Sequence, residues 1–252
     1  MWTESVSKSL TYSGADEYDI TFYVPCLNEE DNIVPTIETI LSALKEVGVS
    51  GEILIYDDNS IDNTVGVVEE YQQKHPGLPI KLIKNNATKG LAYNYIEGAF
   101  LGRGKYYSAV GGDNDVPKEW ILSILKNINS VDVIILYFEQ DTRHRIRVII
   151  SRIFTCLMNL LSGHSLKYYN GAVHLRSNVL RWHSDASGFG FMAELTVRVL
   201  NQGASYIEIA APMYKKKQQV FSKAFTLHSI LSASHTLFKI LILRIRKILF
   251  NI

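Results

Sequence analysis

The sequence contains few cysteines and no long uninterrupted apolar run. Its two cysteines, Cys26 and Cys156, are far apart and form no Cys-x-x-Cys pair, which favours free, buried thiols in a reducing cytoplasm. No stretch reaches the ~18 apolar residues that a membrane span needs. The longest one, residues 229–243, is interrupted by His235 and Lys239.

Three further absences narrow the class of protein. The net charge of +1 creates no global field that would favour nucleic acid as a partner. Residues 1–19 lack a basic region followed by an apolar run, so we expect no signal peptide. The Gly-x-Gly-x-x-Gly fingerprint of dinucleotide-binding proteins does not follow the first predicted strand. With 252 residues and 47% hydrophobic composition, the chain can still build a full globular core.

Strand-like segments alternate with helical ones through the first half of the chain. We predict strands at 20–24, 52–56, 80–84, 105–110 and 131–138, with helices near 30–47, 62–75, 89–102 and 117–127. This alternation is typical of βαβ units and predicts an α/β fold with a mainly parallel sheet flanked by helices. We find no internal repeat or low-complexity linker, and we expect one α/β domain at 1–215 followed by a basic, amphipathic helical appendage at 216–252.

Acidic or polar loops follow three of the predicted strands directly. They read PCLNEE (25–30), DDNS (57–60) and GGDND (111–115). Ligands of parallel α/β sheets bind at the carboxyl ends of the strands. The sequence therefore predicts that these three loops form one site at one edge of the sheet.

The second loop contains two acids that helix capping does not explain. Ser60 and Asp62 are good N-caps for a helix that starts near Thr64, and capping alone accounts for both. Asp57 and Asp58 come too early to cap that helix. A carboxylate at this position can accept hydrogen bonds from a base N–H or a ribose hydroxyl.

The first loop and a further loop at 85–90 have both structural and functional interpretations. The acids at 29–31 complement the dipole of the next helix, which would explain them without a ligand. The loop NNATKG (85–90) leads into another helix. Lys89 and the helix N-terminus could meet phosphate there, or the segment could be a simple turn with Gly90 as its hinge.

Asp113 and Asp115 are best explained as cation ligands. They are one residue apart and follow two glycines at the end of an apolar run. Hard divalent cations take oxygen ligands, and Mg²⁺ commonly uses one or two carboxylates together with substrate phosphates. Such an ion offsets charge on a departing diphosphate. The alternative is a proline-containing turn with a helix cap.

The order of these segments resembles that of family 2 inverting glycosyltransferases with the GT-A fold. The matching segments are VPCLNEEDNI, ILIYDDNSIDNT, NNATKGLAYNYIEGAF, GGDNDVPKEW and GFGFMAELTVRVLNQGASYIEIAAP. The likeness covers about residues 20–225, and the second half is most similar to the dolichol- and polyprenyl-phosphate sugar synthases. It implies a Rossmann-like GT-A domain that takes a nucleoside-diphosphate sugar, GDP- or UDP-linked, as donor.

The resemblance also implies roles for individual residues. Those of the nucleotide-sugar pocket are Pro25, Leu27, Glu29, Asp57, Asp58, Lys89, Gly90 and Asp113. Asp113 and Asp115 would bind Mg²⁺ or Mn²⁺ and count as catalytic, together with Glu194 near the acceptor. An Arg-x-x-x-Ser motif on a helix and a basic residue before a Ser-Lys pair would bind the acceptor phosphate, which assigns Arg147, Ser151 and Lys217.

Several of these assignments have alternatives. Arg147 fits equally well on a solvated or phospholipid-facing basic surface. Glu194 or Asp185 would be the general base if the acceptor were a hydroxyl, but Glu194 could also be an exposed acid on an amphipathic helix. Asn170-Gly171 falls where the family has a turn such as Ser-Gly.

The chain departs from the family pattern at two places. The usual Asp-Ala-Asp-Leu-Gln block, followed by two prolines and Glu, is shortened here to DNDVPKE and lacks the glutamine. Val220 replaces a glycine, and Lys217 replaces an arginine, which loses the bidentate fork of the guanidinium. These departures leave a non-catalytic sugar-nucleotide or lipid-binding module as an alternative to an enzyme.

We expect a metal-dependent hexosyltransferase that uses a lipid-linked acceptor, with a saccharide hydroxyl as the alternative acceptor. The tail at 237–252 mixes Leu, Ile and Phe with four basic residues, a pattern suited to the bilayer interface or to docking on another protein surface. The expected location is cytoplasmic, peripheral on the membrane face, in cell-envelope glycan synthesis. A nucleotidyltransferase would need a glycine-rich basic loop where PCLNEE stands.

Overall fold

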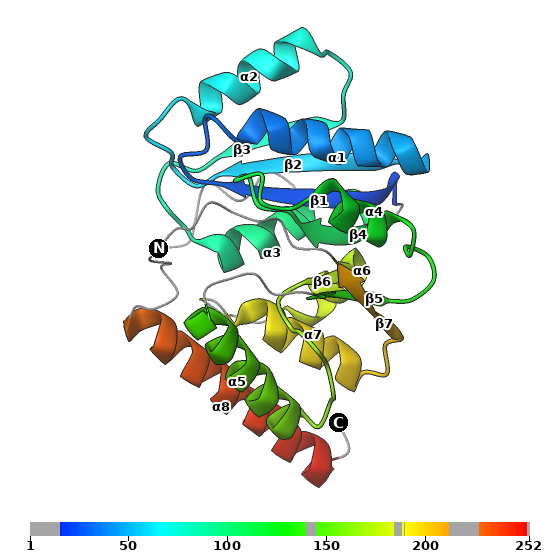
Figure 1. Cartoon of the computed structure of the whole chain (residues 1–252), viewed down its shortest axis with the longest axis vertical. Helices are drawn as coiled ribbons and strands as arrows, with labels where there is room; N and C mark the ends of the chain where they lie inside the picture. Colours follow the sequence, from blue (N-terminus) through cyan, green and yellow to red (C-terminus); the bar gives the residue numbers. More distant parts are fainter. Residues whose placement is uncertain (1–15, 140–144, 184–187, 189, 212–226, 251–252) are drawn as a thin grey trace.

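The computed structural model describes residues 16–139, 145–183, 188, 190–211 and 227–250. They form a seven-stranded sheet of order β3-β2-β1-β4-β6-β5-β7 with helices on both faces (Figure 1). The strands are β1 Tyr18–Cys26, β2 Gly51–Asp57, β3 Ile80–Lys84, β4 Gly104–Ala109, β5 Val133–Phe138, β6 Ala172–Leu175 and β7 Tyr206–Ala211. The helices are α1 Ile33–Val47, α2 Thr64–Lys74, α3 Leu91–Leu101, α4 Lys118–Leu125, α5 Arg145–Ser162, α6 Arg176–Trp182, α7 Phe191–Asn201 and α8 Leu227–Phe250.

All strands of the sheet run in one direction except β6. That strand is antiparallel to both β4 and β5, while the other neighbouring pairs are parallel. The prediction of a mainly parallel sheet is therefore confirmed, but the reversed strand was not predicted. β6 starts at a close approach, since a Cβ on Gly171 would lie 2.6 Å from the Leu136 carbonyl oxygen.

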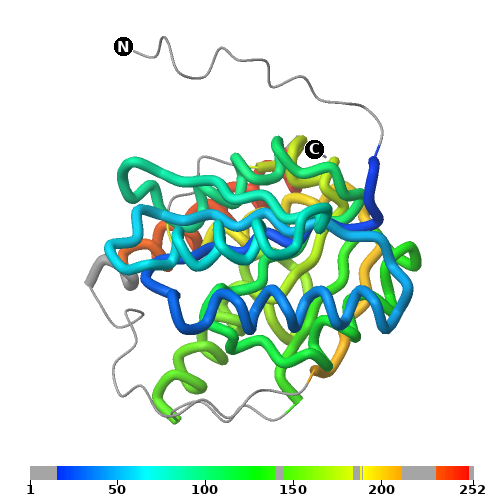
Figure 2. Tube along the Cα trace, turned by 90° about the horizontal axis from the view of Figure 1, so that it is seen from above, coloured from blue at the N-terminus to red at the C-terminus, as the bar shows by residue number. Residues whose placement is uncertain are grey.

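The alternation of side chains along each strand divides the core into two layers. On β1, Phe22 and Val24 face the layer built with α1, α2 and α4, while Tyr23 faces the layer built with α3 and α7. Viewed from above, α1 and α2 lie side by side over one face of the sheet (Figure 2). Both faces of the central strands are thus covered, as a parallel sheet requires.

The C-terminal helix packs against the rest of the protein. α8 lies beside α5 and also contacts α7 (Figure 1). Ile240 of α8 is fully buried, and the Arg244 guanidinium donates to the Ser162 carbonyl oxygen at 3.1 Å. The Lys247 ammonium donates to Asn201 Oδ1 at 3.0 Å. The division of the chain at residue 215 stays a prediction.

Two expectations from composition have different outcomes. Cys26 is buried as expected, but Cys156 is exposed, so the prediction of a buried thiol is wrong there. The reason is that α5 lies on the outside of the protein and buries only Met158 and Ser162 among its residues. Among the described helices, none combines the length and apolar character needed to cross a membrane.

His174 on β6 makes the stability of this fold depend on pH. Its side chain is fully buried, and burial lowers the pKa of the imidazole from 6.5 to about 3. Between these values the unfolded chain binds a proton that the folded chain does not. The contribution of His174 to the free energy of unfolding is therefore fully present above about pH 6.5. It is lost as the pH falls toward 3, by up to about 1.4 kcal/mol per pH unit.

Urea unfolding of a His174→Gln variant at several pH values between 4 and 7.5 tests this dependence. The variant should lose up to about 1.4 kcal/mol per pH unit of slope below pH 6.5. A His75→Gln variant serves as a control, because His75 is exposed. Equal slopes in the wild type and the His174 variant would contradict the assignment.

Candidate functional site

Acids from three loops surround the end of β1. The Asp58 N–H donates to the Cys26 carbonyl oxygen at 2.9 Å, and the Gly112 N–H donates to the Pro25 carbonyl oxygen at 3.1 Å. Burial raises the pKa of the Cys26 thiol, and the negative charges of Asp57, Glu29 and Asp113 raise that pKa further. The structure therefore brings together the three loops that the sequence placed at one edge of the sheet.

The first two loops are joined by several hydrogen bonds. The Asn28 N–H donates to Ser60 Oγ at 2.9 Å, and the Glu29 N–H donates to Thr64 Oγ1 at 2.8 Å. Asp62 accepts the N–H of Thr64, the first residue of α2, at 3.0 Å. The N-cap of α2 is Asn63, so the prediction of Ser60 or Asp62 as the N-cap is wrong, although Asp62 still accepts the first N–H of the helix. The Ser60 hydroxyl accepts from the first loop instead.

Asp58 holds the loop between β3 and α3 in place. Its carboxylate accepts hydrogen bonds from the Asn85 side chain at 2.9 Å, from the Lys89 N–H at 2.9 Å and from the Gly90 N–H at 3.0 Å. Burial on its own raises the pKa of Asp58, but these hydrogen bonds outweigh it and hold that pKa below its ordinary value. Asp58 is therefore a structural anion whose oxygens are occupied by the protein.

Among the acids of these loops, Asp57 has a buried carboxylate oxygen that accepts no hydrogen bond from the part of the chain that the structure describes. The residue is only 3% exposed. Its Oδ2 accepts the Ser60 N–H at 3.2 Å, while its Oδ1 has no hydrogen-bond partner among the described residues. A buried carboxylate oxygen without a donor is costly. A ligand N–H or hydroxyl that reached this oxygen would remove that cost.

The loop between β3 and α3, residues 85–90, presents a cation beside an aromatic ring. The Lys89 ammonium lies 3.5 Å from Glu97 Oε2 and 4.9 Å from the centroid of the Tyr93 ring. Gly90 has φ of +91°, a backbone conformation that side chains with a Cβ rarely adopt. The chain therefore turns at Gly90, and the Lys89 side chain beside it is 38% exposed.

The glycine directly before Asp113 allows a close approach to β1. A Cβ on Gly112 would lie 2.7 Å from Cys26 Sγ and 2.9 Å from the Pro25 carbonyl oxygen. The chain then turns at Asn114, whose φ is +53°, and the Asp115 N–H donates to Asp113 Oδ1 at 3.4 Å. Both aspartates remain partly exposed at the carboxyl edge of the sheet.

The donor set of this loop fits a divalent cation that is shared with a substrate. No group of three or more His, Cys, Asp or Glu side chains that could hold a metal ion on its own occurs among the residues that the structure describes. Mg²⁺ is commonly held by one or two carboxylates, with water and substrate phosphates completing the octahedron. Asp113 and Asp115 supply these two carboxylates. Half-buried Pro25 and Leu27, which is 38% exposed, belong to the adjacent first loop.

Each of the three loops turns through a left-handed asparagine. Asn28, Asn59 and Asn114 have φ of +61°, +71° and +53°. Asparagine tolerates this conformation better than other residues with a Cβ. The motifs LNEE, DDNS and DND contain the signal, but the prediction from sequence concentrated on the acids and missed the turn residues.

The predicted acceptor residues are only partly brought together. Arg147 is exposed on α5, and Ser151, one turn further, lines a pocket of about 440 Å³ that Arg147 does not line. Lys217 and Asp185 lie outside the described residues. Prediction from sequence missed two cationic residues of this pocket, Arg152 and Lys167, because they belong to no recognised motif.

Glu194 is a buried anion between two cations. The residue has no exposed surface, so the interpretation as an exposed acid on an amphipathic helix is wrong. Its Oε1 accepts from Arg198 Nη2 at 2.8 Å, and its Oε2 lies 3.6 Å from the Lys239 ammonium of α8. These ion pairs neutralise its charge, and its role as a catalytic base stays a prediction.

Comparison with known proteins identifies the family. The profile of glycosyl transferase family 2 matches residues 21–180. A dolichyl-phosphate beta-glucosyltransferase of Dictyostelium discoideum is 30% identical over 103 residues, which cover 39% of this chain and 32% of that protein. A dolichol-phosphate mannosyltransferase of Pyrococcus furiosus is 29% identical over 117 residues, covering 46% and 32%. The chain thus spans about a third of each relative.

Solved structures agree on the fold. Glucosyl-3-phosphoglycerate synthase from Mycobacterium tuberculosis, in complex with Mn²⁺, uridine-diphosphate and phosphoglyceric acid, superposes with a TM-score of 0.65 and 12% identity. The superposition covers 90% of this chain and 78% of that one. The fold is that of GT-A glycosyltransferases, and the chain belongs to glycosyl transferase family 2.

Substitution of the two neighbouring aspartates should separate stability from ligand binding. Asp58→Ala should lower the free energy of unfolding by about 2–4 kcal/mol, because three donors lose a charged acceptor. Asp57→Asn should change it by less than about 1 kcal/mol and should weaken nucleotide binding at least roughly tenfold, since a ligand donor loses a charged acceptor. Urea unfolding and titration with UDP and GDP in the presence of Mn²⁺ measure the two effects. Similar profiles for both variants would contradict the division of roles.

Proposed function

We propose that this family 2 glycosyltransferase transfers a sugar, with inversion, from a nucleoside-diphosphate sugar to a lipid-linked acceptor, polyprenyl phosphate. The observation that carries the proposal is the meeting of Asp57, Asp113 and Lys89 at one sheet edge. These groups supply an acceptor for base or ribose, an oxygen ligand for a cation and a cation for phosphate. A nucleoside-diphosphate sugar requires all three.

The donor would lie across the three loops. Asp57 Oδ1 accepts a hydrogen bond from the base or ribose, and Pro25, Leu27 and Glu29 form the adjacent wall. Asp58 supports the donor indirectly, because its carboxylate fixes the backbone of Lys89 and Gly90. The Lys89 ammonium offsets phosphate charge at the start of α3.

Asp113 and Asp115 would hold Mg²⁺ or Mn²⁺ against the diphosphate. When bound, the cation offsets the charge that develops on the diphosphate as it leaves. The shortened DNDVPKE block retains both carboxylates, and Asn114 turns the chain between them. The position of the pair is fixed by the close packing of Gly112 on β1.

An acceptor phosphate would attack without a general base. One of its ionised oxygens forms a bond to the anomeric carbon while the bond from that carbon to the diphosphate breaks, so no proton has to be removed. A hydroxyl acceptor would need a base, and Glu194, the predicted one, would first have to exchange its ion pairs with Arg198 and Lys239. The burial of Glu194 therefore favours a phosphate acceptor.

The names of the relatives support the same class of acceptor. Those from Dictyostelium discoideum and Pyrococcus furiosus carry dolichyl or dolichol phosphate in their names. GDP- and UDP-linked donors both fit the proposal.

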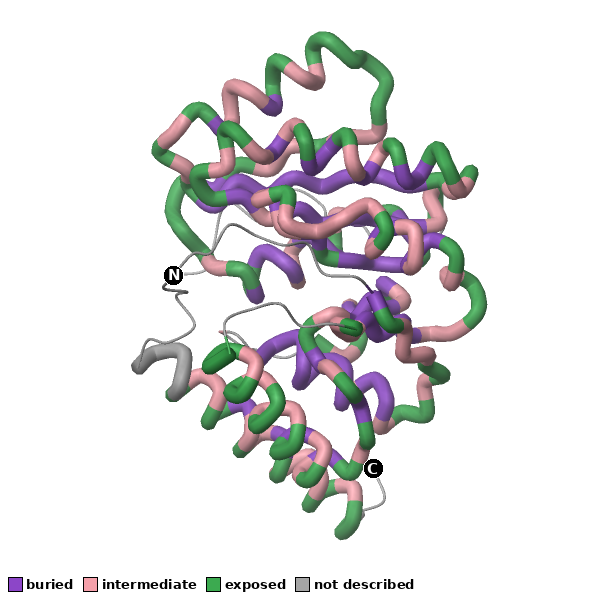
Figure 3. Tube along the Cα trace, viewed as in Figure 1, coloured by how far each residue is buried: buried purple, intermediate pink, exposed green. Residues whose placement is uncertain are grey.

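Two adjacent helices offer a surface suited to the bilayer interface. α5 and α8 together contain seven Lys or Arg residues and no Asp or Glu, although acids make up 25 of the chain's 252 residues. Each helix also exposes a row of large apolar side chains, and Figure 3 shows these helices exposed on one side. The rows are Ile146, Ile149, Ile150, Ile153, Leu157 and Leu160 on α5, and Leu231, Phe238, Leu241, Ile245, Ile248 and Leu249 on α8.

This surface would place the enzyme on the cytoplasmic face of the membrane. Apolar side chains enter the boundary between headgroups and acyl chains, and each basic residue near an anionic surface contributes about 1 kcal/mol. Arg147, which the motif assigned to the acceptor phosphate, is one of these exposed basic residues. A lipid-linked acceptor would then be taken up beside α5.

Removing one metal ligand should abolish metal-dependent donor binding. In a titration with GDP- and UDP-sugars with and without Mn²⁺, the wild type should bind one donor only with the metal. Asp115→Ala should weaken this binding at least roughly tenfold, since even outer-shell partners of metal ligands change affinity 10–100-fold. Glu119→Ala is the matched control, because this exposed acid lies on α4. Donor affinity that is unchanged without Mn²⁺ and in Asp115→Ala would favour a non-catalytic module.

Vesicle flotation tests the membrane surface. The protein should float with vesicles that contain anionic phospholipid and much less with neutral ones. A double variant, Ile149→Glu with Ile153→Glu, should reduce flotation at least roughly tenfold, because both side chains are about half exposed and enter the interface. Leu78→Glu, on the loop before β3, is the control. Unchanged flotation of the double variant would contradict this surface.

A further inference from the structure

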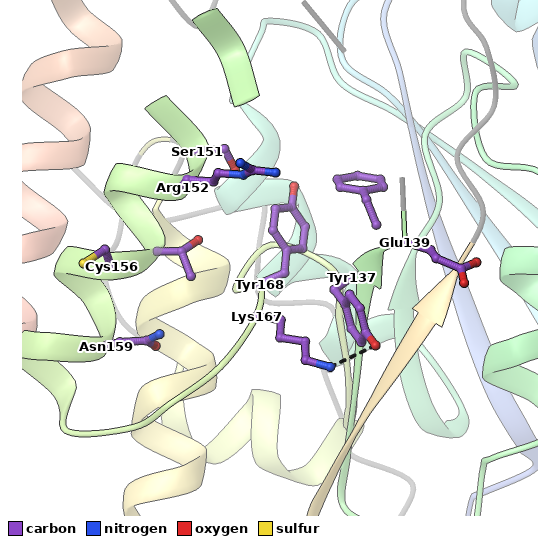
Figure 4. A pocket seen from close by; sticks show the side chains of 10 residues that line it. Tyr137, Glu139, Ser151, Arg152, Cys156, Asn159, Lys167 and Tyr168 are labelled. Atoms are coloured by element: carbon purple, nitrogen blue, oxygen red, sulfur yellow. Dashed lines mark hydrogen bonds between the residues drawn. The ribbon is translucent and has the colours of Figure 1, made fainter. Parts of the chain in front are cut away.

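A pocket lined by charged, polar and aromatic side chains lies at the carboxyl end of β5. It has a volume of about 440 Å³ and is bounded by the carboxyl end of β5, by α5 and by the segment before β6. Figure 4 shows the side chains that line it, among them Arg152 from α5, Lys167 and Tyr168 from the segment before β6, and Tyr137 from β5. The donor interactions described above use none of these residues.

The pocket lies at the same edge of the sheet as the donor loops. β6 is antiparallel to both β4 and β5, so β4 and β5 run in the same direction and end at the same edge. Phe138 at the end of β5 lines the pocket, and its ring lies 5.4 Å from that of Trp120 on α4. Since α4 directly follows the Asp113–Asp115 loop, a ligand in the pocket would lie near the leaving diphosphate.

The charges of the pocket favour an anion. Lys167 and Arg152 line it from different elements; Tyr168 lies between them, and the Lys167 ammonium is turned toward Tyr137 (Figure 4). The Lys167 ammonium donates to the Tyr137 hydroxyl at 2.9 Å and lies 4.1 Å from the centroid of its ring, which holds this exposed side chain in one direction. The acid of the lining, Glu139, is on the opposite side with its carboxylate turned away from both cations (Figure 4). Ser151 adds a hydroxyl donor.

The remaining lining suits an organic phosphate better than a free ion. The rings of Phe138 and Tyr168 lie 5.1 Å apart, edge to face, and offer an apolar wall next to the cations. A phosphate monoester has a dianionic head for Lys and Arg and an organic part for such a wall. On α5, Ser151 and Arg152 line the pocket, while the neighbouring Ile150 and Ile153 belong to the exposed apolar row.

We propose that this pocket binds the phosphate monoester of the acceptor and that Lys167 and Arg152 are its two cationic ligands. The inference rests on the proposed function and goes beyond it, because it assigns acceptor binding to two residues outside the Arg-x-x-x-Ser motif. Ser151 is the point at which the motif and the pocket meet. The phosphate can come from a lipid headgroup or from a water-soluble ester.

Calorimetric titration of the full chain with three phosphates tests the pocket without requiring turnover. The probes are geranyl phosphate, glycerol 3-phosphate and inorganic phosphate, measured with wild type, Lys167→Ala and Arg152→Ala. Each variant should raise the Kd of the phosphate ester roughly tenfold, the effect of one charge-assisted hydrogen bond. Both residues are exposed, so the variants should fold. Lys74→Ala, an exposed change at the end of α2, should have no effect.

The two phosphate esters distinguish the source of the ligand. Geranyl phosphate that binds at least roughly tenfold more tightly than glycerol 3-phosphate supports a lipid headgroup, since apolar contact adds affinity. Equal binding of the two esters supports a site that recognises the phosphate of a soluble ester. Wild type that binds none of the three probes overturns the inference, as do variants that bind them as tightly as wild type does.

Donor binding separates the failure of this inference from the failure of the proposed function. The same variants are titrated with the nucleotide sugar and Mn²⁺, and the donor Kd should stay within a factor of two of the wild-type value. Retained donor binding with unchanged phosphate binding in Lys167→Ala and Arg152→Ala would overturn the pocket assignment alone. A different result would be a wild type that binds no nucleotide sugar but binds the phosphate esters more tightly than Lys167→Ala does. That result would support the anion pocket and contradict the proposed transferase function.

Discussion

β1 pairs in parallel with β2 on one side and with β4 on the other, and this pairing determines where the functional side chains lie. Three strands that end together must release three loops at one edge. The protein then fixes those loops through backbone contacts, as when Gly112 packs directly on Cys26. Asp58 extends the arrangement by holding the loop of Lys89. Without the parallel register, Asp57 and Asp113 would belong to unrelated parts of the surface.

Neighbouring residues in this protein have different roles because their partners differ. Asp58 gives its oxygens to the protein, whereas Asp57 keeps one buried oxygen without a partner among the described residues. In a similar way, α5 turns Ser151 and Arg152 toward the pocket and Ile153 toward solvent. The proposed donor site, acceptor pocket and lipid-facing surface can therefore lie on neighbouring elements, and Arg152 belongs both to the pocket and to the basic residues of that surface.

Sequence periodicity located most elements within a few residues, because apolar strands alternate with amphipathic helices in the first half. The acidic loops could also be placed, since each follows a strand directly. β6 could not be predicted, because a four-residue strand carries little pattern of its own. The pocket was missed because its cationic residues, Arg152 and Lys167, belong to no recognised motif and come from different elements. Glu194 of α7 is buried next to Lys239 of α8. The sequence of α7 alone does not predict this contact between two helices.

The most direct test of the central claim is a transfer assay with product analysis. Purified protein, Mn²⁺, an α-linked nucleotide sugar and polyprenyl phosphate are incubated together, and the lipid fraction is examined by mass spectrometry and by NMR of the anomeric proton. A glycosyl phosphate with β configuration, formed with release of the nucleoside diphosphate, is the predicted result. A product that retains the α configuration, or no lipid-linked product from any GDP- or UDP-sugar, would contradict it.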